Sequence, residues 1–524
     1  MKKMKLNSIS LLFLLIATLL IVVGCSGNEE VSNTEETAVN SDTVEEGTPV
    51  QGGEAVFAYN TDLSNYDPIK GSAGSDHTLL WPVYETLIKF TSELEPEPGL
   101  AESWEFTDNT TLLLNLREGV TFHDGTPFNA EAVKFNIERI NSGESNISDL
   151  ENIEKVEIID EHTVELIFSQ PDSSILLALS DRGGMMASPT AVEEYGEDYS
   201  LNPTGAGPFK MVNHIPNGEI VFEAFEEYWQ EGQPYLDKMT VKIMAEENTR
   251  INALKSGEVD LAYYLSPTNV QSLESDPNIV LKQVVPVKFR MLYINTEYEH
   301  VNNKAVRQAI LHGIDREAIV QAINFGKGEA AYQPFPADYW ASDSELTIEY
   351  NPEKAKELLK EAGLENVSIT MNHYTTAYEQ RIAEAIKSQL SEIGIEVNLQ
   401  SMELSAAVSN YFSEKEVPVF LSSWTGRPDP QMTINYLFAS DSFYNVGGHS
   451  TEEIESLISQ AASNYNQEER AELYKKINQK AVLEEAIMIP LFFELVTDAM
   501  NPSIKGYEPN MLGKPVFSTI WKEQ

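Results

Sequence analysis

A short loop in the carboxyl-terminal part of the sequence combines charged side chains with a rigid backbone. It reads Trp424-Thr425-Gly426-Arg427-Pro428-Asp429-Pro430 and follows an apolar run. Pro430 disfavours helical dihedral angles at Asp429, and Pro428 fixes its own φ near −65°, so the aspartate carboxylate is held on a stiff, extended loop. Stiffness of this kind suits a binding site.

Arg427 and Trp424 are the other candidate binding residues of this loop. Arg427 can take a ligand carboxylate through two parallel hydrogen bonds, and a solvated surface arginine fits the sequence equally well. Trp424 can wall a pocket, with packing in the core nearly as good an interpretation. For Asp429, a solvated turn residue is the ordinary alternative, so its position in the fold has to decide its role.

The sequence lacks the common motifs of catalysis and of metal binding. G-x-S-x-G, G-x-x-x-x-G-K-[ST] and H-E-x-x-H are all absent. The 8 histidines never occur at i, i+2 or i, i+4 spacing, which disfavours a preformed multi-histidine metal site. We therefore predict no catalytic residue, no metal and no cofactor, and a secreted hydrolase with an unrecognised site remains the enzymatic alternative.

The elements around the loop alternate as they do in a parallel α/β sheet. Strands are expected at Val367–Tyr374, Ile395–Leu399 and Val417–Trp424, and helices at Tyr378–Ile393 and Leu404–Phe412. This βαβαβ pattern predicts a right-handed, doubly wound sheet whose ligands lie beyond the carboxyl ends of its strands. The loop after Trp424 is therefore expected where a crevice forms.

A second lobe is expected from the rest of the chain. The first half is mixed α+β, with a strand at Thr110–Leu116, a helix at Ala130–Ile140 and a hairpin at residues 151–168. The late apolar segment Met488–Val496 is interpreted as a strand that returns to the sheet of the first half. Such a return would give two chain crossings between the lobes.

The first 25 residues are typical of a secretory signal. Lys2, Lys3 and Lys5 precede the apolar stretch Leu11–Val23, which at about 20 Å is too short for the ~30 Å core of a bilayer. The sole cysteine, Cys25, ends a segment that resembles a bacterial lipobox, so we predict a lipidated protein anchored at the extracellular face of the cell membrane, the periplasmic side in a Gram-negative cell. Residues 26–53 have no Lys or Arg and no apolar period, which predicts an acidic, flexible tether.

Composition limits the class of protein and its partners. The 524 residues carry 36 Lys and Arg against 82 Asp and Glu, a formal net charge of −46. Such a chain repels a phosphate backbone, which needs cationic side chains to displace its counterions, so nucleic acid binding is excluded. The length suffices for roughly two to four domains, and with 42% hydrophobic residues we expect a globular protein, most simply a monomer.

Several segments resemble family 5 of the extracellular solute-binding proteins, which feed ATP-driven importers. The most specific are Leu100–Trp104 and Leu116–Phe128, a strand followed by a tight turn into a helix. Further matches follow in the order of the family: Asn202–Phe209, Ala253–Asp260, Ala305–Ile310 and Gly313–Arg316. The resemblance covers nearly all of the mature chain.

The resemblance implies a bilobal α/β fold of the periplasmic-binding-protein type, with an extra subdomain and a two-strand hinge. Lobe I would comprise residues 54–288, with an inserted subdomain at about 85–205. Lobe II would comprise residues 289–488, and residues 489–524 would return to lobe I. The hinge strand would be Phe289–Asn295, which adds Arg290 as a candidate ligand-binding residue.

The resemblance also implies further site residues. In this family an aspartate of the loop resembling Trp424–Pro430 commonly pairs with the α-ammonium of a peptide, and Asp429 is the matching position. The segment Asp181–Pro189 resembles one that lines the cleft, and would supply Met185 and Met186 as adaptable apolar contacts, although two methionines are more often core residues. On this hypothesis Asp429→Asn weakens peptide binding and leaves the fold intact.

The hypothesis that follows is a lipid-anchored receptor of an importer. It would capture di- to oligopeptides by closure of its lobes and deliver them to membrane permease and ATPase components. A receptor of the same family for glutathione, a nickel chelate or another small polar solute is the alternative. A peptide-pheromone receptor or a chaperone-like module would share the same cleft.

Overall fold

The computed structural model describes residues 47–71, 76–364 and 366–523. Every described residue belongs to one compact unit, Gly47–Gln524. The predicted signal, Cys25 and most of the predicted tether lie outside the described residues. Within the described ranges, no helix combines the length and apolar character that crossing a bilayer requires.

The last residues of the predicted tether already contact the folded body. The amide of Gly52 donates to the carbonyl of Tyr235 at 2.8 Å, and the amide of Gly53 donates to the carboxylate of Asp237 at 2.9 Å. The first strand then begins at Glu54.

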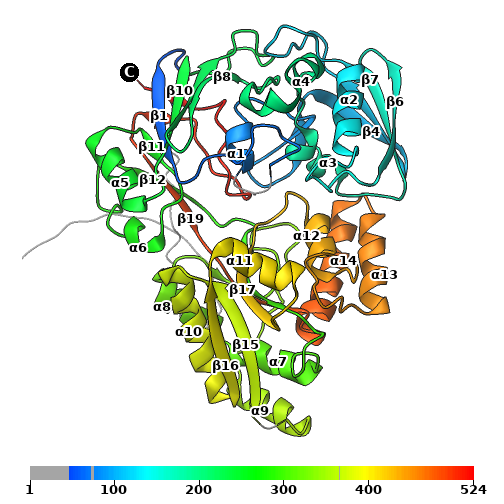
Figure 1. Cartoon of the computed structure of the whole chain (residues 1–524), viewed down its shortest axis with the longest axis vertical. Coiled ribbons are helices and arrows are strands. Elements are labelled where there is room, and N and C mark those ends of the chain that lie inside the picture. Colours follow the sequence, from blue (N-terminus) through cyan, green and yellow to red (C-terminus); the bar gives the residue numbers. More distant parts are fainter. Residues whose placement is uncertain (1–46, 72–75, 365, 524) are drawn as a thin grey trace, which may run out of the picture. The chain divides into compact units, whose positions relative to one another are not determined.

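A seven-stranded mixed sheet organises one half of this unit, in the upper part of Figure 1. Its strands, in spatial order, are β12 (Val280–Val284), β19 (Val496–Met500), β11 (Leu261–Ala262), β1 (Glu54–Tyr59), β10 (Lys238–Ile243), β9 (Glu219–Ala224) and β8 (Phe209–Ile215). The central strand β1 pairs in parallel with β10 and β11. The short helices α5 (Glu247–Ser256) and α6 (Pro267–Val270) pack on this sheet through Ile251, Leu254 and Val270.

A four-stranded antiparallel sheet forms a separate core between β1 and β8 in the sequence. Its strands are, in spatial order, β4 (Ala101–Asp108), β5 (Thr111–Leu116), β7 (Thr163–Phe168) and β6 (Ile153–Asp160). The helix α2 (Ala130–Ile140) has its predicted bounds because Asn129 caps it, accepting a hydrogen bond from the amide of Ala132 at 3.2 Å. The smaller elements nearby are α1 (Asp76–Leu80), β2 (Ile88–Phe90), β3 (Pro96–Pro98), α3 (Ile175–Ala178) and α4 (Pro189–Tyr195).

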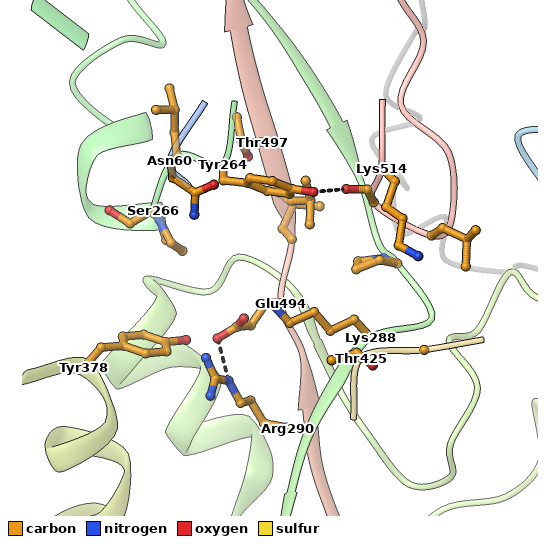
Figure 2. A pocket seen from close by; sticks show the side chains of 18 of the residues that line it. Asn60, Tyr264, Ser266, Lys288, Arg290, Tyr378, Thr425, Glu494, Thr497 and Lys514 are labelled. Carbon is orange, nitrogen blue, oxygen red and sulfur yellow. Dashed lines mark hydrogen bonds and ion pairs between the residues drawn. The ribbon is translucent and has the colours of Figure 1, made fainter. Parts of the chain in front are cut away.

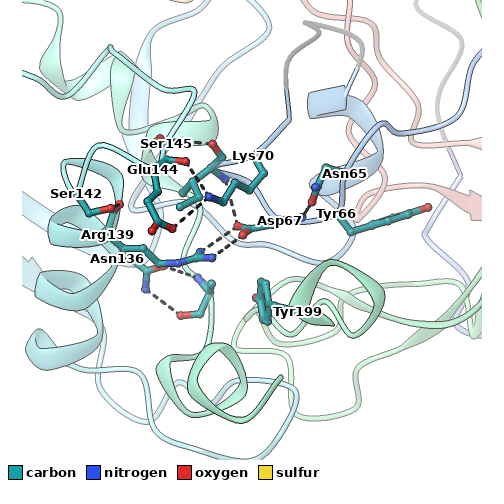
Figure 3. Close-up of polar contacts among 12 residues, drawn as sticks. Asn65, Tyr66, Asp67, Lys70, Asn136, Arg139, Ser142, Glu144, Ser145 and Tyr199 are labelled. Carbon is teal, nitrogen blue, oxygen red and sulfur yellow. Dashed lines mark hydrogen bonds and ion pairs between the residues drawn. The ribbon is translucent and has the colours of Figure 1, made fainter. Parts of the chain in front are cut away.

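An ion pair joins this small sheet domain to the chain that leaves β1. Arg139, at the end of α2, donates to both carboxylate oxygens of the buried Asp67, at 2.9 and 2.5 Å (Figure 3). Asn136 of the same helix exchanges hydrogen bonds with the backbone of Ala187. The two-point geometry fixes the orientation of α2 as well as its position.

A six-stranded sheet organises the other half, in the lower part of Figure 1. Its spatial order is β14 (Glu329–Ala330), β18 (Met488–Phe493), β13 (Phe289–Ile294), β17 (Val419–Trp424), β15 (Val367–Tyr374) and β16 (Ile395–Met402). The predicted βαβαβ unit is confirmed, because β15 pairs in parallel with both β16 and β17. The sheet as a whole is mixed rather than parallel, since β13 is antiparallel to β17 and to β18.

Helices cover this second sheet and extend away from it. They are α7 (Lys304–Gly313), α8 (Arg316–Asn324), α9 (Pro352–Glu361), α10 (Ala377–Glu392), α11 (Leu404–Val408), α12 (Pro430–Phe438), α13 (Glu452–Ala462) and α14 (Gln467–Asn478). The helix predicted at Leu404–Phe412 is α11 continued by a wider helical turn, Ser409–Ser413. Two short strands, β20 (Ile504–Lys505) and β21 (Trp521–Lys522), end the chain.

The return strand differs from the prediction. The segment expected as one strand, Met488–Val496, is divided between the sheets: β18 stays in the second sheet and β19 joins the first. The break falls at Glu494 and Leu495, where a carboxylate interrupts the apolar run and pairs with Arg290. The other crossing is made by residues 285–288, between β12 and β13.

The small sheet domain also contacts helices of the second half. The hydroxyl of Tyr436 in α12 donates to Asp149 at 2.6 Å, and the hydroxyl of Tyr465 donates to the carbonyl of Asn109 at 2.8 Å. The amide of Ser173 donates to the carbonyl of Ala462 at 2.8 Å. The two halves are therefore joined both at the crossings and at this contact.

Candidate ligand-binding site

A cavity of about 560 Å³ lies where the two crossing segments meet both sheets (Figure 2). Its volume is within the usual range for sites that hold small molecules. Its walls are Tyr59, Asn60, Glu247, Tyr264, Leu265, Ser266, Pro267, Val496 and Thr497 from the first half, Pro286, Lys288, Glu494 and Leu495 from the crossings, Arg290, Tyr378, Thr425, Gly426 and Arg427 from the second half, and Leu512, Gly513 and Lys514. The cavity is thus built where relative motion of the halves would open or close it.

The loop after β17 reaches the cavity through a close backbone contact. Gly426 has φ of +79°, and a Cβ there would come within 2.7 Å of the side chain of Val287 and 3.1 Å of its backbone. Glycine is required both because φ is positive and because any Cβ would clash with Val287. The contact places Thr425 and Arg427 against the first crossing segment.

Arg427 is a cation that lies against a pair of aromatic rings. The carbon of its guanidinium lies 5.1 Å from the ring centres of Trp424 and of Tyr436. Although burial opposes its charge, Asp149 and neighbouring tyrosines raise the pKa of Arg427, so it remains cationic. Its Nη1 donates to the carbonyl of Gly426 at 2.9 Å and to Thr425 at 3.3 Å, while its buried Nε has no hydrogen-bond partner among the described residues.

Arg290 connects the two crossing segments. It pairs with Glu494 of the second crossing at 2.9 Å and with Glu379 of α10, and its guanidinium lies over the ring of Tyr378 (Figure 2). Burial alone would raise the pKa of Glu494, but Arg290 and Lys288 hold it at about 2. Burial raises the pKa of Glu379 in spite of Arg290. Arg290 therefore lines the cavity, with its charge already balanced by protein carboxylates.

Lys288 and Lys514 add basic side chains to the walls. Lys514 pairs with Asp181 at 3.5 Å. Lys288 has no ion pair or hydrogen bond within the part of the chain that the structure describes, and burial lowers its pKa although Glu494 opposes this. The hydroxyl of Tyr264 donates to the carbonyl of Gly513 at 2.7 Å, which fixes the wall beside Lys514 (Figure 2).

Asp429 lies outside the cavity, which corrects the placement expected from the sequence. It is 2% exposed and caps α12, accepting from the amide of Gln431 at 2.7 Å and from the guanidinium of Arg470 at 2.5 Å. Burial raises the pKa of Asp429 even though Arg470 opposes this. Pro430 does stiffen the loop as expected, but as the first residue of a helix.

Trp424, Met185 and Met186 also lie away from the cavity walls. All three are buried, and the indole of Trp424 donates to Thr433 at 3.1 Å. Met185 packs in the core of the first sheet and Met186 in that of the small sheet domain. All three therefore pack in the core, which was the alternative interpretation. Trp424 contributes to the site only because its ring packs against Arg427.

The structure thus brings Arg290 and Arg427 together at one cavity, and it adds residues that the sequence did not single out. Lys288 and Glu494 are charged residues within otherwise apolar crossing segments, and this feature of the sequence could have indicated them as site residues. No feature of the sequence indicates Tyr59, Tyr264 or Tyr378 as site residues. Within the described ranges, no three His, Cys, Asp or Glu side chains gather as a metal site.

Comparison with known proteins identifies the family. Residues 95–445 match the family described as bacterial extracellular solute-binding proteins, family 5 Middle. The chain belongs to this family. The glutathione-binding protein GsiB of Shigella flexneri is 30% identical over 474 residues, which cover 87% of this chain and 91% of that protein. The family consists of binding proteins rather than enzymes.

Solved structures of family 5 proteins have the same bilobal fold. The ABC transporter-associated periplasmic binding protein DppA from Helicobacter pylori, in complex with the peptide STSA, is 26% identical with a TM-score of 0.80, covering 91% of this chain and 99% of that one. AgaA of Agrobacterium tumefaciens, in complex with agropinic acid, is 25% identical with a TM-score of 0.79, covering 90% and 99%. GsiB is named for glutathione, and the two solved structures contain a peptide and agropinic acid.

Proposed function

We propose that this family 5 protein is the receptor of an ATP-driven importer, and that it captures a peptide or a peptide-like solute in the cavity between its sheets. The observation that supports this most is the position of the cavity at both chain crossings. A ligand there contacts both halves at once. The receptor would deliver the closed complex to permease and ATPase components in the membrane.

Capture works by a shift between open and closed arrangements. A ligand that touches both halves has its full set of contacts only when they are closed, so it favours closure by its differential affinity. The contacts of Tyr436 with Asp149 and of Ser173 with Ala462 join the halves through the small sheet domain. Opening would break such contacts, while the crossings would act as the hinge.

The proposed lobes follow the two sheets. Lobe I would comprise residues 54–288, with the subdomain at about 85–205 inserted in it, and lobe II would begin at 289. We move its end from 488 to 493, because β18 belongs to the second sheet. The remaining residues would return to lobe I.

Binding is expected to stabilise the protein in a dose-dependent way. Glutathione or the peptide STSA, at a hundredfold excess over its dissociation constant, should add about 2.7 kcal/mol to the free energy of unfolding, because only the folded cavity binds. Thermal unfolding at increasing ligand concentration measures this. Chromatography of the same mixtures checks the hydrolase alternative, which requires a cleaved product. No stabilisation by either ligand, and no small molecule retained by the purified protein, would contradict the proposal.

A receptor for glutathione or another small polar solute is the second candidate. The basic walls of the cavity favour it, and the curated relative is named for glutathione. A metal chelate would have to be held through its organic groups, since the described residues offer no cluster of metal ligands. In the unfolding experiment, the ligand that stabilises the protein at the lowest concentration is the one that binds most tightly.

We further propose that the protein is a monomer anchored to the extracellular face of the membrane through Cys25. The sole cysteine, at the end of a segment that resembles a lipobox and ahead of an acidic stretch, supports this. Cys25→Ala should release the protein into the medium or periplasm, because the buried acyl chains supply the membrane affinity. Fractionation followed by immunoblotting measures the release, and a variant that stays in the membrane fraction would refute the anchor.

A further inference from the structure

The cavity has a basic character that the chain as a whole does not share. Its charged wall residues are basic at Lys288, Arg290, Arg427 and Lys514 and acidic only at Glu247 and Glu494. The chain carries 82 acidic against 36 basic residues. The cavity is therefore locally basic within an acidic protein, and this local charge favours the binding of an anionic ligand.

Most of these charges already have partners in the protein. Arg290 is balanced by Glu379 and Glu494, and Lys514 pairs with Asp181. The carboxylate of Glu247 accepts from the amide of Ser266 at 2.6 Å. Lys288 and Arg427 are the cavity cations without an ion pair among the residues that the structure describes.

The donors of Arg427 are oriented but incompletely used. Its Nη1 is occupied by Gly426 and Thr425, and no hydrogen bond involves its Nη2 or its buried Nε in the described chain. Nε and Nη2 form one edge of the guanidinium, which matches the two oxygens of a carboxylate. The rings of Trp424 and Tyr436 hold the group in place without neutralising it.

The cavity offers no comparable site for a ligand ammonium. Both wall carboxylates, Glu247 and Glu494, are engaged, and Asp429 lies outside with Arg470 as its partner. We infer that the solute is anchored by a carboxylate, held by Arg427 and Lys288, and that its amino group contributes little to affinity. This rests on the proposed function and names the substrate class as small, peptide-like acids.

The test uses matched ligands with and without each charge. Isothermal titration of the full mature chain would compare glutathione with its diethyl ester and its N-acetyl derivative, and the peptide STSA with its C-terminal amide and N-acetyl forms. Removal of the carboxylates should weaken binding about tenfold to a hundredfold, because hydrogen bonds between charged groups are lost. N-acetylation should change affinity less than about threefold.

Variants assign the effect to the two side chains. Lys288→Met and Arg427→Gln should each weaken glutathione binding about tenfold or more, and should weaken binding of the diester much less, because both changes remove the same contact. Arg427→Lys keeps the positive charge but loses the two parallel N–H donors, so its affinity for glutathione should lie between those of the wild type and Arg427→Gln. Lys282→Met is the matched control, since Lys282 pairs with Glu508 outside the cavity and its loss changes the net charge equally. Melting temperatures without ligand verify folding.

The outcomes separate the two levels of the proposal. If acid and ester bind equally and N-acetylation abolishes binding, the carboxylate anchor is wrong and the receptor function stands. If affinity for the acid is unchanged in both folded cavity variants, the assignment to Lys288 and Arg427 is wrong. If no form of either probe binds, the proposed function itself fails for peptide-like solutes, and the anchor fails with it.

Discussion

Asp429→Ala is expected to lower the free energy of unfolding by about 3–5 kcal/mol. Asp429 is buried with Arg470, and the loss of its carboxylate leaves the guanidinium without a counter-charge in the interior. The cap of α12 is lost as well. Urea unfolding at neutral pH measures the effect, and calorimetry on the folded fraction should give glutathione affinity close to that of the wild type.

Asp315→Ala is the matched control. Asp315 caps α8, accepting from the amide of Ala318 at 2.9 Å, and has no ion pair within the described part of the chain. Its replacement should cost only about 1 kcal/mol, the usual value for a lost helix cap. If Asp429→Ala were as stable as Asp315→Ala but no longer bound glutathione, the structural role would be wrong and Asp429 would be a ligand-binding residue.

Arg290→Met is expected to destabilise the protein by about 3 kcal/mol at neutral pH. The pKa of Glu494 is about 2 in the folded state against an ordinary 4.5. A lowered carboxyl pKa contributes stability that is present above the ordinary value and is lost as pH falls through the folded value. The difference between wild type and variant should therefore be full above about pH 5 and should shrink toward pH 2.

A second substitution distinguishes charge from packing in this prediction. Glu494→Gln, added to Arg290→Met, removes the carboxylate that the first change leaves unpaired, so the double variant should regain part of the lost stability. Arg290→Lys should be milder than Arg290→Met. A stability difference that is constant from pH 3 to pH 7, or a double variant as unstable as the sum of the single ones, would show that Arg290 acts through packing alone.

The local elements of the second sheet could be predicted from the sequence because their signals are local. Val367–Tyr374 has its predicted bounds as β15, and the helix that follows ends before Gly394, which adopts φ of +86°. Alternating burial and a left-handed glycine are properties of neighbouring residues. The partner of a strand is not such a property, which is why Met488–Val496 was predicted as one strand and is divided between two sheets.

The site was predicted less well for the same reason. Asp429 lies in a loop that suits a ligand-binding residue, but its partner Arg470 is 41 residues later, on α14. No feature of the sequence near Asp429 predicts this ion pair. Lys288 gains its importance only because the crossing segment places it, half-buried, beside Glu494, more than two hundred residues away in the chain. Arg427 was weighed evenly between ligand and surface, and the rings around it favour the first interpretation.

Small-angle X-ray scattering with and without ligand tests closure of the cavity most directly. The mature chain would be measured alone, with saturating glutathione and with saturating peptide STSA, after calorimetry has established which of them binds. Closure about the crossings of residues 285–288 and 494–495 predicts a smaller radius of gyration in the saturated sample and an unchanged one for Arg427→Gln at a concentration that leaves it unbound. An unchanged radius for the wild type at proven saturation would contradict capture by closure.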